Sequence, residues 1–173
     1  MLEAGFFTGE RFELIDGDLI DKMGQNPPHA GAIQLCMALL VKIFGVERVR
    51  VQLPIEAGPA DRERSVPEPD LAVLAEVKPD FSRRHPNGQE LALLVEVADT
   101  TLRHDAVTKR DLYARSDVPE YWVLDLNSRR LIVHRELDAG LAQYASIQSY
   151  TEDQAISIGS PLGQSISVSS LLP

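Results

Sequence analysis

Three residues of this chain have side chains suited to chemistry on a charged substrate: Asp70, Glu96 and Lys109. Glu96 interrupts the nearly continuous apolar run 91–97, where a carboxylate is costly to bury unless it is paired or bound to a metal. A structural ion pair or an edge position would explain it as well, because such pairs perturb buried acids just as functional sites do. Glu96 therefore marks either a reactive site or a structural ion pair.

Asp70 opens another apolar segment, directly after the stiff sequence Pro-Glu-Pro at 67–69. By itself this pattern is typical of a turn that starts a strand. If strands 71–74 and 91–97 are neighbours, however, Asp70 and Glu96 meet at one end of the sheet. Two carboxylates that share a site repel each other unless a cation lies between them. Hard oxygen ligands of this kind favour Mg²⁺ or Mn²⁺.

Downstream of Glu96, Asp105, Lys109 and Tyr113 are spaced four residues apart and share one face of an expected helix. The simplest interpretation is an exposed ion pair between Asp105 and Lys109, which contributes a few tenths of a kcal/mol. The spacing alone favours that interpretation over a role for Lys109 in a site.

The elements that would position these residues follow from turn signals and apolar periodicity. Asp-Gly at 16–17 between apolar runs predicts a β-hairpin over 12–20. Asn-Pro-Pro at 26–28 should stop regular structure before helix 30–44, which Gly45 ends. Further expected elements are strands over 48–55, 71–74, 91–97, 121–126 and 131–135, a helix over 105–116, and short strands from 141 to 173.

This β-rich order with two helices predicts an α/β protein of the α+β type, with a mixed sheet flanked by helices. Its 173 residues fit a single domain spanning 1–173. Helix 30–44 is apolar on almost every face, which indicates deep burial or the surface of a homodimer. Cys36 lies inside this helix, so a buried, inert thiol is expected.

Composition narrows the classes of function. Neither a signal peptide nor an apolar run of the roughly 20 residues that span a bilayer is visible, so a cytoplasmic protein without a membrane partner is expected. The net charge of −9 counts against a broad nucleic-acid-binding surface. Acidic enzymes that act on nucleic acid confine their basic residues to one face and recruit Mg²⁺. The candidates for such a patch, or else for solvated loops, are Arg83, Arg84, Arg103 and Lys109.

Taken together, these motifs resemble a known family. The run 66–73 looks like the first half of a PD-(D/E)XK nuclease motif. Segment 94–105, followed by Lys109, Tyr113 and 118–125, is similar to the Uma-type putative restriction endonuclease family, long catalogued as a domain of unknown function. The hairpin sequence 12–17 and Pro28-His29 match that family too, and the resemblance extends over residues 10–135.

The resemblance implies a Mg²⁺- or Mn²⁺-dependent endonuclease that cleaves DNA. Asp70 and Glu96 would bind the metal together with the Val97 carbonyl, and Lys109 would orient or activate the attacking water. Glu13 would approach from the hairpin and Asp105 would hold Lys109 in place. Trp122 and Tyr113 would belong to the core, and His29 would be a polar group at the helix entry.

One departure from the superfamily pattern supports a rival interpretation. The lysine expected two residues after Glu96 is replaced by Ala98, and Lys109 would supply the ammonium from the helix instead. The alternative is a catalytically inactive nuclease fold that acts as a dimeric interaction or regulatory module. The two interpretations differ in geometry, because only the enzyme requires Asp70, Glu96 and Lys109 to converge.

Overall fold

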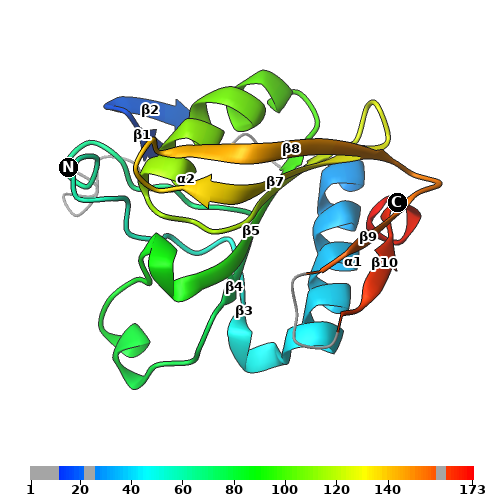
Figure 1. Cartoon of the computed structure of the whole chain (residues 1–173), viewed down its shortest axis with the longest axis horizontal. Coiled ribbons are helices and arrows are strands. Elements are labelled where there is room, and N and C mark those ends of the chain that lie inside the picture. Colours follow the sequence, from blue (N-terminus) through cyan, green and yellow to red (C-terminus); the bar gives the residue numbers. More distant parts are fainter. Residues whose placement is uncertain (1–11, 22–25, 159–162) are drawn as a thin grey trace.

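A six-stranded mixed sheet forms the centre of the protein (Figure 1). This computed structural model describes residues 12–21, 26–158 and 163–173. In spatial order the strands are β3 (Val49–Val51), β4 (Leu71–Leu74), β5 (Leu91–Ala98), β6 (Tyr121–Asp125), β7 (Arg130–Asp138) and β8 (Gln143–Thr151). β5 and β6 run parallel, and the other neighbours are antiparallel. The predicted mixed sheet of an α+β protein is confirmed.

Two hairpins lie outside this sheet. β1 (Phe12–Ile15) pairs with β2 (Asp18–Asp21), and β9 (Ala155–Ser157) pairs with β10 (Ser165–Ser167). Asp16 and Gly17 have φ values of 52° and 93°, the positive values that a type I′ turn requires. The predicted N-terminal hairpin is therefore confirmed. The backbone N–H of Val66 donates to the Leu14 carbonyl at 2.7 Å, which attaches the hairpin to the loop before Asp70.

β5 lies inside the sheet and is covered on both faces, which explains its almost unbroken apolar sequence. Val95 and Val97 pack into one core cluster with residues of α1 (Pro27–Phe44), whereas Leu94 and Ala98 pack into a second cluster on the opposite face. Glu96 alternates with Val95 and Val97, so its side chain projects into the second face.

α1 begins three residues earlier than predicted. Pro27 and Pro28 occupy its first turn, where a missing backbone N–H costs nothing, and the Asn26 side chain caps the helix by accepting from the His29 N–H at 3.0 Å. The expectation that these prolines stop regular structure is wrong at this end of the helix. Gly45 ends the helix as predicted.

The burial of α1 is one-sided. Ala32, Ile33, Cys36 and Leu40 are its buried residues, whereas Leu35 and Met37 are 39% and 37% exposed. Its length and composition alone would also suit a bilayer-spanning helix. Its buried face belongs to the core that covers the sheet, which accounts for the apolar residues on that side of the helix only.

The second helix differs from the predicted α-helix in its first half. Residues His104–Lys109 form a π-helix (η5), and α2 (Arg110–Arg115) continues from it. The Arg110 N–H reaches back five residues to the Asp105 carbonyl, to which the Tyr121 hydroxyl also donates at 3.1 Å. Such π turns occur frequently at functional sites. Within the described ranges there are also four short 3₁₀ helices: η2 (Val46–Arg48), η3 (Pro79–Ser82), η4 (Gly88–Glu90) and η6 (Val168–Leu171).

Candidate functional site

Asp70 and Glu96 meet where β4 and β5 lie side by side. The antiparallel register pairs Leu71 with Val95, which places Asp70 opposite Glu96. The Asp70 N–H donates to Glu96 Oε2 at 3.3 Å, and the Val97 N–H donates to Asp70 Oδ2 at 2.9 Å. Both acidic residues are only 3% exposed. The strand pairing thus brings two buried carboxylates to one end of the sheet.

Lys109 points into the same cluster from η5. Its Nζ lies 2.9 Å from Glu96 Oε1, 2.8 Å from Glu13 Oε1 and 3.8 Å from Asp105 Oδ1. The Lys109 side chain is 4% exposed, so the exposed Asp105–Lys109 pair that spacing alone favoured is not what forms. The structure brings Asp70, Glu96 and Lys109 together.

The charge of Lys109 is fixed by these neighbours. Burial lowers the pKa of the ammonium, but the carboxylates of Glu96, Glu13 and Asp105 outweigh burial and raise this pKa above its ordinary value. Lys109 is therefore a permanent cation near neutral pH. It can stabilise negative charge and donate hydrogen bonds, but it cannot accept a proton from water.

Glu13 and Asp105 surround this cation from different elements. Glu13 comes from β1, and its second oxygen accepts from the Glu68 N–H at 3.3 Å, in the loop that leads to Asp70. Asp105 accepts a 2.5 Å hydrogen bond from the Thr101 hydroxyl, and burial raises its pKa. Both contact Lys109, so they hold its ammonium group beside Glu96.

Negative charge exceeds positive charge among the fully buried groups of the cluster. Among the described residues, the carboxylates of Glu13, Glu96 and Asp105 lie within 4.0 Å of the Lys109 ammonium, and the buried Asp70 lies beside Glu96. Burial raises the pKa of Glu96, Lys109 lowers it, and the nearby Asp70 raises it further. A bound cation would relieve this imbalance.

The donor set fits a hard divalent ion. Within the part of the chain that the structure describes, no group of three or more His, Cys, Asp or Glu side chains is arranged to hold a metal. A cation here would depend on the Asp70 and Glu96 carboxylates, the Val97 carbonyl and waters. Mg²⁺ is commonly held in this way, by one or two carboxylates together with water and substrate phosphate.

His29 lies at the helix entry, as predicted, and also contacts this site. The first turn of α1 brings its Nε2 to 3.5 Å from Asp70 Oδ2, with 18% of the side chain exposed. The hydrogen bond to Asp70 raises the pKa of the imidazole against the opposing effect of burial. The sequence signal was Pro-Pro-His at a helix start, but only the fold reveals that α1 begins beside Asp70.

Tyr113 is a second contact that the sequence did not reveal. Its ring is in the core as predicted, yet its hydroxyl donates to Glu96 Oε1 at 2.7 Å. Burial raises the pKa of this phenol well above its ordinary value, so the hydroxyl keeps the proton that it donates to Glu96. Trp122, by contrast, is 1% exposed within the core, as predicted.

Two members of the predicted basic patch, Arg84 and Lys109, are paired with acidic side chains. Arg84 is bound to Glu90 at 2.7 Å and to Asp80 at 2.9 Å, so its charge is already compensated. Lys109 is buried among carboxylates rather than directed towards solvent. These two members of the set therefore have acidic partners inside the protein.

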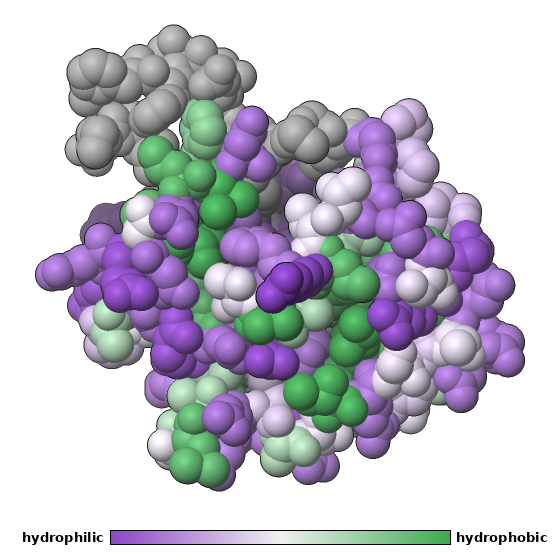
Figure 2. Space-filling view, turned by 90° about the horizontal axis from the view of Figure 1, so that it is seen from above, coloured by the Kyte–Doolittle hydropathy of each residue, from purple (hydrophilic) through white to green (hydrophobic). Residues whose placement is uncertain are grey.

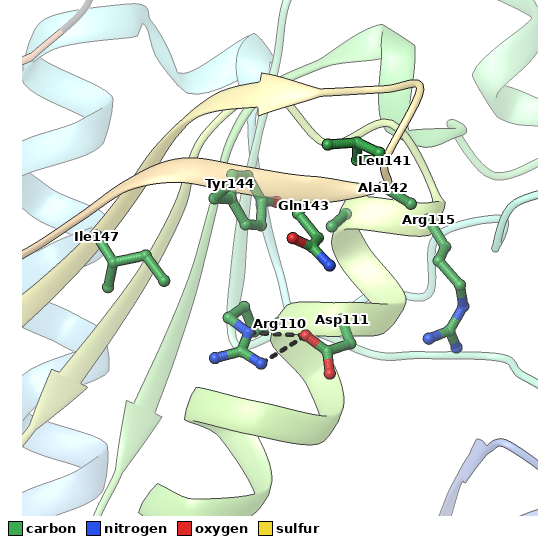
Figure 3. Close-up of a pocket in the computed structure, with 9 residues that line it drawn as sticks. Arg110, Asp111, Arg115, Leu141, Ala142, Gln143, Tyr144 and Ile147 are labelled. Carbon is green, nitrogen blue, oxygen red and sulfur yellow. Dashed lines mark hydrogen bonds and ion pairs between the residues drawn. The ribbon is translucent and has the colours of Figure 1, made fainter.

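A separate cavity of about 450 Å³ lies between α2 and β8 (Figure 3). Its charged residues have partners as well: Arg110 contacts Asp111 at 2.7 Å, and Arg115 contacts Asp61 at 2.9 Å. Neither Asp70 nor Glu96 lines it. On the face that Figure 2 shows, hydrophobic atoms form several patches separated by hydrophilic ones. The carboxylate cluster remains the candidate site.

Comparison with protein families agrees with this geometry. A family model described as putative restriction endonuclease, Uma2, matches residues 2–169. The chain belongs to the Uma2 family. This match covers nearly the whole chain and confirms the family resemblance found in its motifs.

Among solved structures, a putative nuclease belonging to DUF820 from Anabaena variabilis ATCC 29413 has a similar fold, with a TM-score of 0.68 at 15% identity. The similarity covers 92% of this chain and 88% of the other. No curated protein matches this sequence. At this identity the structural neighbour shows only that this Uma2 protein shares its fold. The assignment to the nucleases comes from the family.

Proposed function

We propose that this Uma2 protein is a Mg²⁺- or Mn²⁺-dependent endonuclease that hydrolyses phosphodiester bonds of DNA. The observation that carries the proposal is the convergence of Asp70, Glu96 and Lys109 from β4, β5 and η5. A fold retained only for packing does not need a buried cluster with excess acid, because uncompensated buried charge destabilises a protein. This argues against the inactive interaction module.

Each residue has a distinct role in this proposal. Asp70, Glu96 and the Val97 carbonyl would hold the divalent cation, which supplies polarisation of the scissile phosphate and a more acidic bound water. Lys109 would stabilise the negative charge that develops on the phosphate during hydrolysis. The raised pKa of Lys109 makes it an electrostatic group rather than the base.

Glu13, Tyr113 and Asp105 position these groups. Glu13 and Asp105 contact the Lys109 ammonium, and Tyr113 donates to the same Glu96 oxygen that Lys109 contacts. Glu96 Oε1 is thus engaged by protein donors. Among the described residues, Glu96 Oε2 has only the long contact to the Asp70 N–H at 3.3 Å and is therefore the better placed to bind a cation.

A cleavage assay tests the proposal. Supercoiled, linear and single-stranded DNA and an RNA are incubated with the wild type in Mg²⁺ or Mn²⁺, beside Asp70→Asn, Glu96→Gln and the exposed control Glu63→Gln. We expect metal-dependent cleavage of DNA that both site variants lose and the control retains. Activity that is indifferent to both site substitutions would rule out this site, and cleavage of RNA alone would overturn the assignment of DNA.

The predicted homodimer is a separate proposal. Leu35 and Met37 leave apolar surface on α1, a surface that a second copy could cover. Light scattering at micromolar concentration measures it directly, and a monomer would contradict the dimer without affecting the nuclease proposal.

A further inference from the structure

Arg50 on β3 has an under-satisfied guanidinium group. Its Nε is shielded from solvent and, among the described residues, has no hydrogen-bond partner. Its Nη2 reaches the Pro54 carbonyl and His85 Nδ1, both at 3.5 Å, the upper limit for a hydrogen bond. Since a guanidinium carries five N–H donors, most of the Arg50 donors have no partner among the residues that the structure describes.

Arg50 also lacks an acidic partner, in contrast to most described arginines. Within the described ranges, seven arginines lie within 4.0 Å of a carboxylate: Arg64, Arg84, Arg110, Arg115, Arg129, Arg130 and Arg135. Burial lowers the pKa of Arg50, and no carboxylate offsets this effect. In a chain with net charge −9, a half-buried arginine that contacts no carboxylate of the described residues is suited to bind an anion from outside the protein.

The strand register places Arg50 on the same face of the sheet as the carboxylate site. Arg50 lies opposite Ala72, and Ala72 lies opposite Leu94, two residues before Glu96. Side chains two residues apart share a face. Gln52 is the residue opposite Asp70, and Arg50 lies two residues before it on the same strand. From the usual spacing along a strand and between strands, the backbones of Arg50 and Asp70 are about 8 Å apart.

His85 adds a second donor beside Arg50. A guanidinium cannot accept a hydrogen bond, so in their contact His85 Nδ1 is the acceptor. The proton of the neutral ring then lies on Nε2, which is left to donate to another group. His85 is exposed, so an incoming anion can reach both donors.

We propose that Arg50 and His85 form an anion site that binds a backbone phosphate of the nucleic acid, adjacent to the phosphate held at the carboxylate cluster. Arginine suits this contact because its planar group binds phosphate oxygens in pairs. The use of the site for a polynucleotide rests on the proposed nuclease function. Binding of the phosphate group itself rests only on the geometry of Arg50.

The anion site is tested with inorganic phosphate, without any cleavage. In ¹⁵N-labelled protein, the Arg50 Nε–H signal, assigned by its absence in Arg50→Lys, is followed during a phosphate titration. We expect a saturable shift of this signal, whereas the exposed Arg62 shows none. If the Arg50 signal does not move, or moves no more than that of Arg62, the anion site is refuted.

Oligonucleotide binding tests the source of the phosphate. With EDTA present, binding of a DNA duplex is measured across a salt series for the wild type, Arg50→Gln, Arg50→Lys and the control Arg62→Gln. We expect Arg50→Gln to weaken binding about tenfold and to reduce the slope of log K against log salt by about one. Arg50→Lys, which keeps the charge, should restore part of the loss, and Arg62→Gln should match the wild type.

The two arms separate the possible outcomes. If the wild type binds phosphate but Arg50→Gln binds the duplex as tightly as the wild type, the proposal that the site holds a phosphate of the nucleic-acid backbone is overturned. Loss of duplex affinity in Arg50→Gln, in a wild type that never cleaves DNA, supports the phosphate site and refutes only the proposed catalysis.

Discussion

The ammonium of Lys109 and the carboxylate of Glu96 form an ion pair of 2.9 Å in which each side chain is only 4% exposed. Pairs this deeply buried are costly to disrupt from one side, because the remaining charge has neither partner nor water. The pair links the helix to the central strand, so it bears on both stability and chemistry.

Replacing Lys109 by Met should lower the free energy of unfolding by about 3–5 kcal/mol, because it leaves the buried Glu96 and Glu13 without their cationic partner. Urea unfolding at pH 7 measures this loss. The exposed Lys42→Met serves as the control for removal of one positive charge. A Lys109→Met variant as stable as Lys42→Met would show that the carboxylates are not charged in the native protein.

The hydroxyl of Tyr113 should contribute to the site independently of packing. Tyr113→Phe removes the 2.7 Å hydrogen bond to Glu96 and keeps the ring, so we expect about 1.5–3 kcal/mol lower stability. We also expect a lower kcat in the cleavage assay, because Glu96 loses a group that orients it. Tyr150→Phe, at a partly exposed position, is the matched control. Equal stability of the two variants would contradict the role of this hydrogen bond.

Acid should weaken the loop that contains Arg84 and Glu90. The Arg84 guanidinium holds the pKa of the Glu90 carboxyl below its ordinary value of 4.5. A lowered pKa in the folded state gives stability that is present above the unfolded pKa and is lost as pH falls below it. Urea unfolding from pH 7 to pH 3 should therefore show a smaller acid-induced loss for Glu90→Gln than for the wild type.

The exposed Glu76 provides the comparison for that experiment. Glu76→Gln should follow the pH profile of the wild type. If the stability of Glu90→Gln follows the wild-type pH profile over the whole range, the ion pair between Arg84 and Glu90 does not stabilise the fold.

Cys36 should be chemically silent in the native protein. It is 2% exposed, and burial raises the pKa of its thiol to about 12, so almost no thiolate exists at neutral pH. We expect no labelling by a thiol reagent over hours in buffer and complete labelling in urea. Rapid native labelling would show that α1 separates readily from the sheet.

Local sequence signals predicted much of the fold. Asp16-Gly17 specified the hairpin, and the apolar run around Glu96 specified a central strand with an unusual carboxylate. These predictions succeed because a turn type and two-sided burial are properties of a few adjacent residues.

What the sequence could not reveal depends on long-range packing. The environment of Lys109 is created by Glu13, almost one hundred residues away, and His29 enters the site only because α1 starts beside Asp70. Likewise β3 ends at Val51, shorter than predicted, where Gln52 adopts a φ of 49° and its side chain reaches Asp70 at 3.4 Å. No periodicity within one segment encodes such contacts.

The assembly of the site from β1, β4, β5 and η5 has a consequence for synthesis of the chain. Glu96 is synthesised before Lys109 and Tyr113, so its two side-chain partners are missing until both residues have left the ribosome. Glu13 is synthesised earlier still and has no Lys109 to contact until then. A chain that stops before Lys109 therefore carries the carboxylates of the cluster without the ammonium group that contacts them. Such a fragment lacks the complete site, whereas a fragment that extends past Tyr113 contains every residue of it.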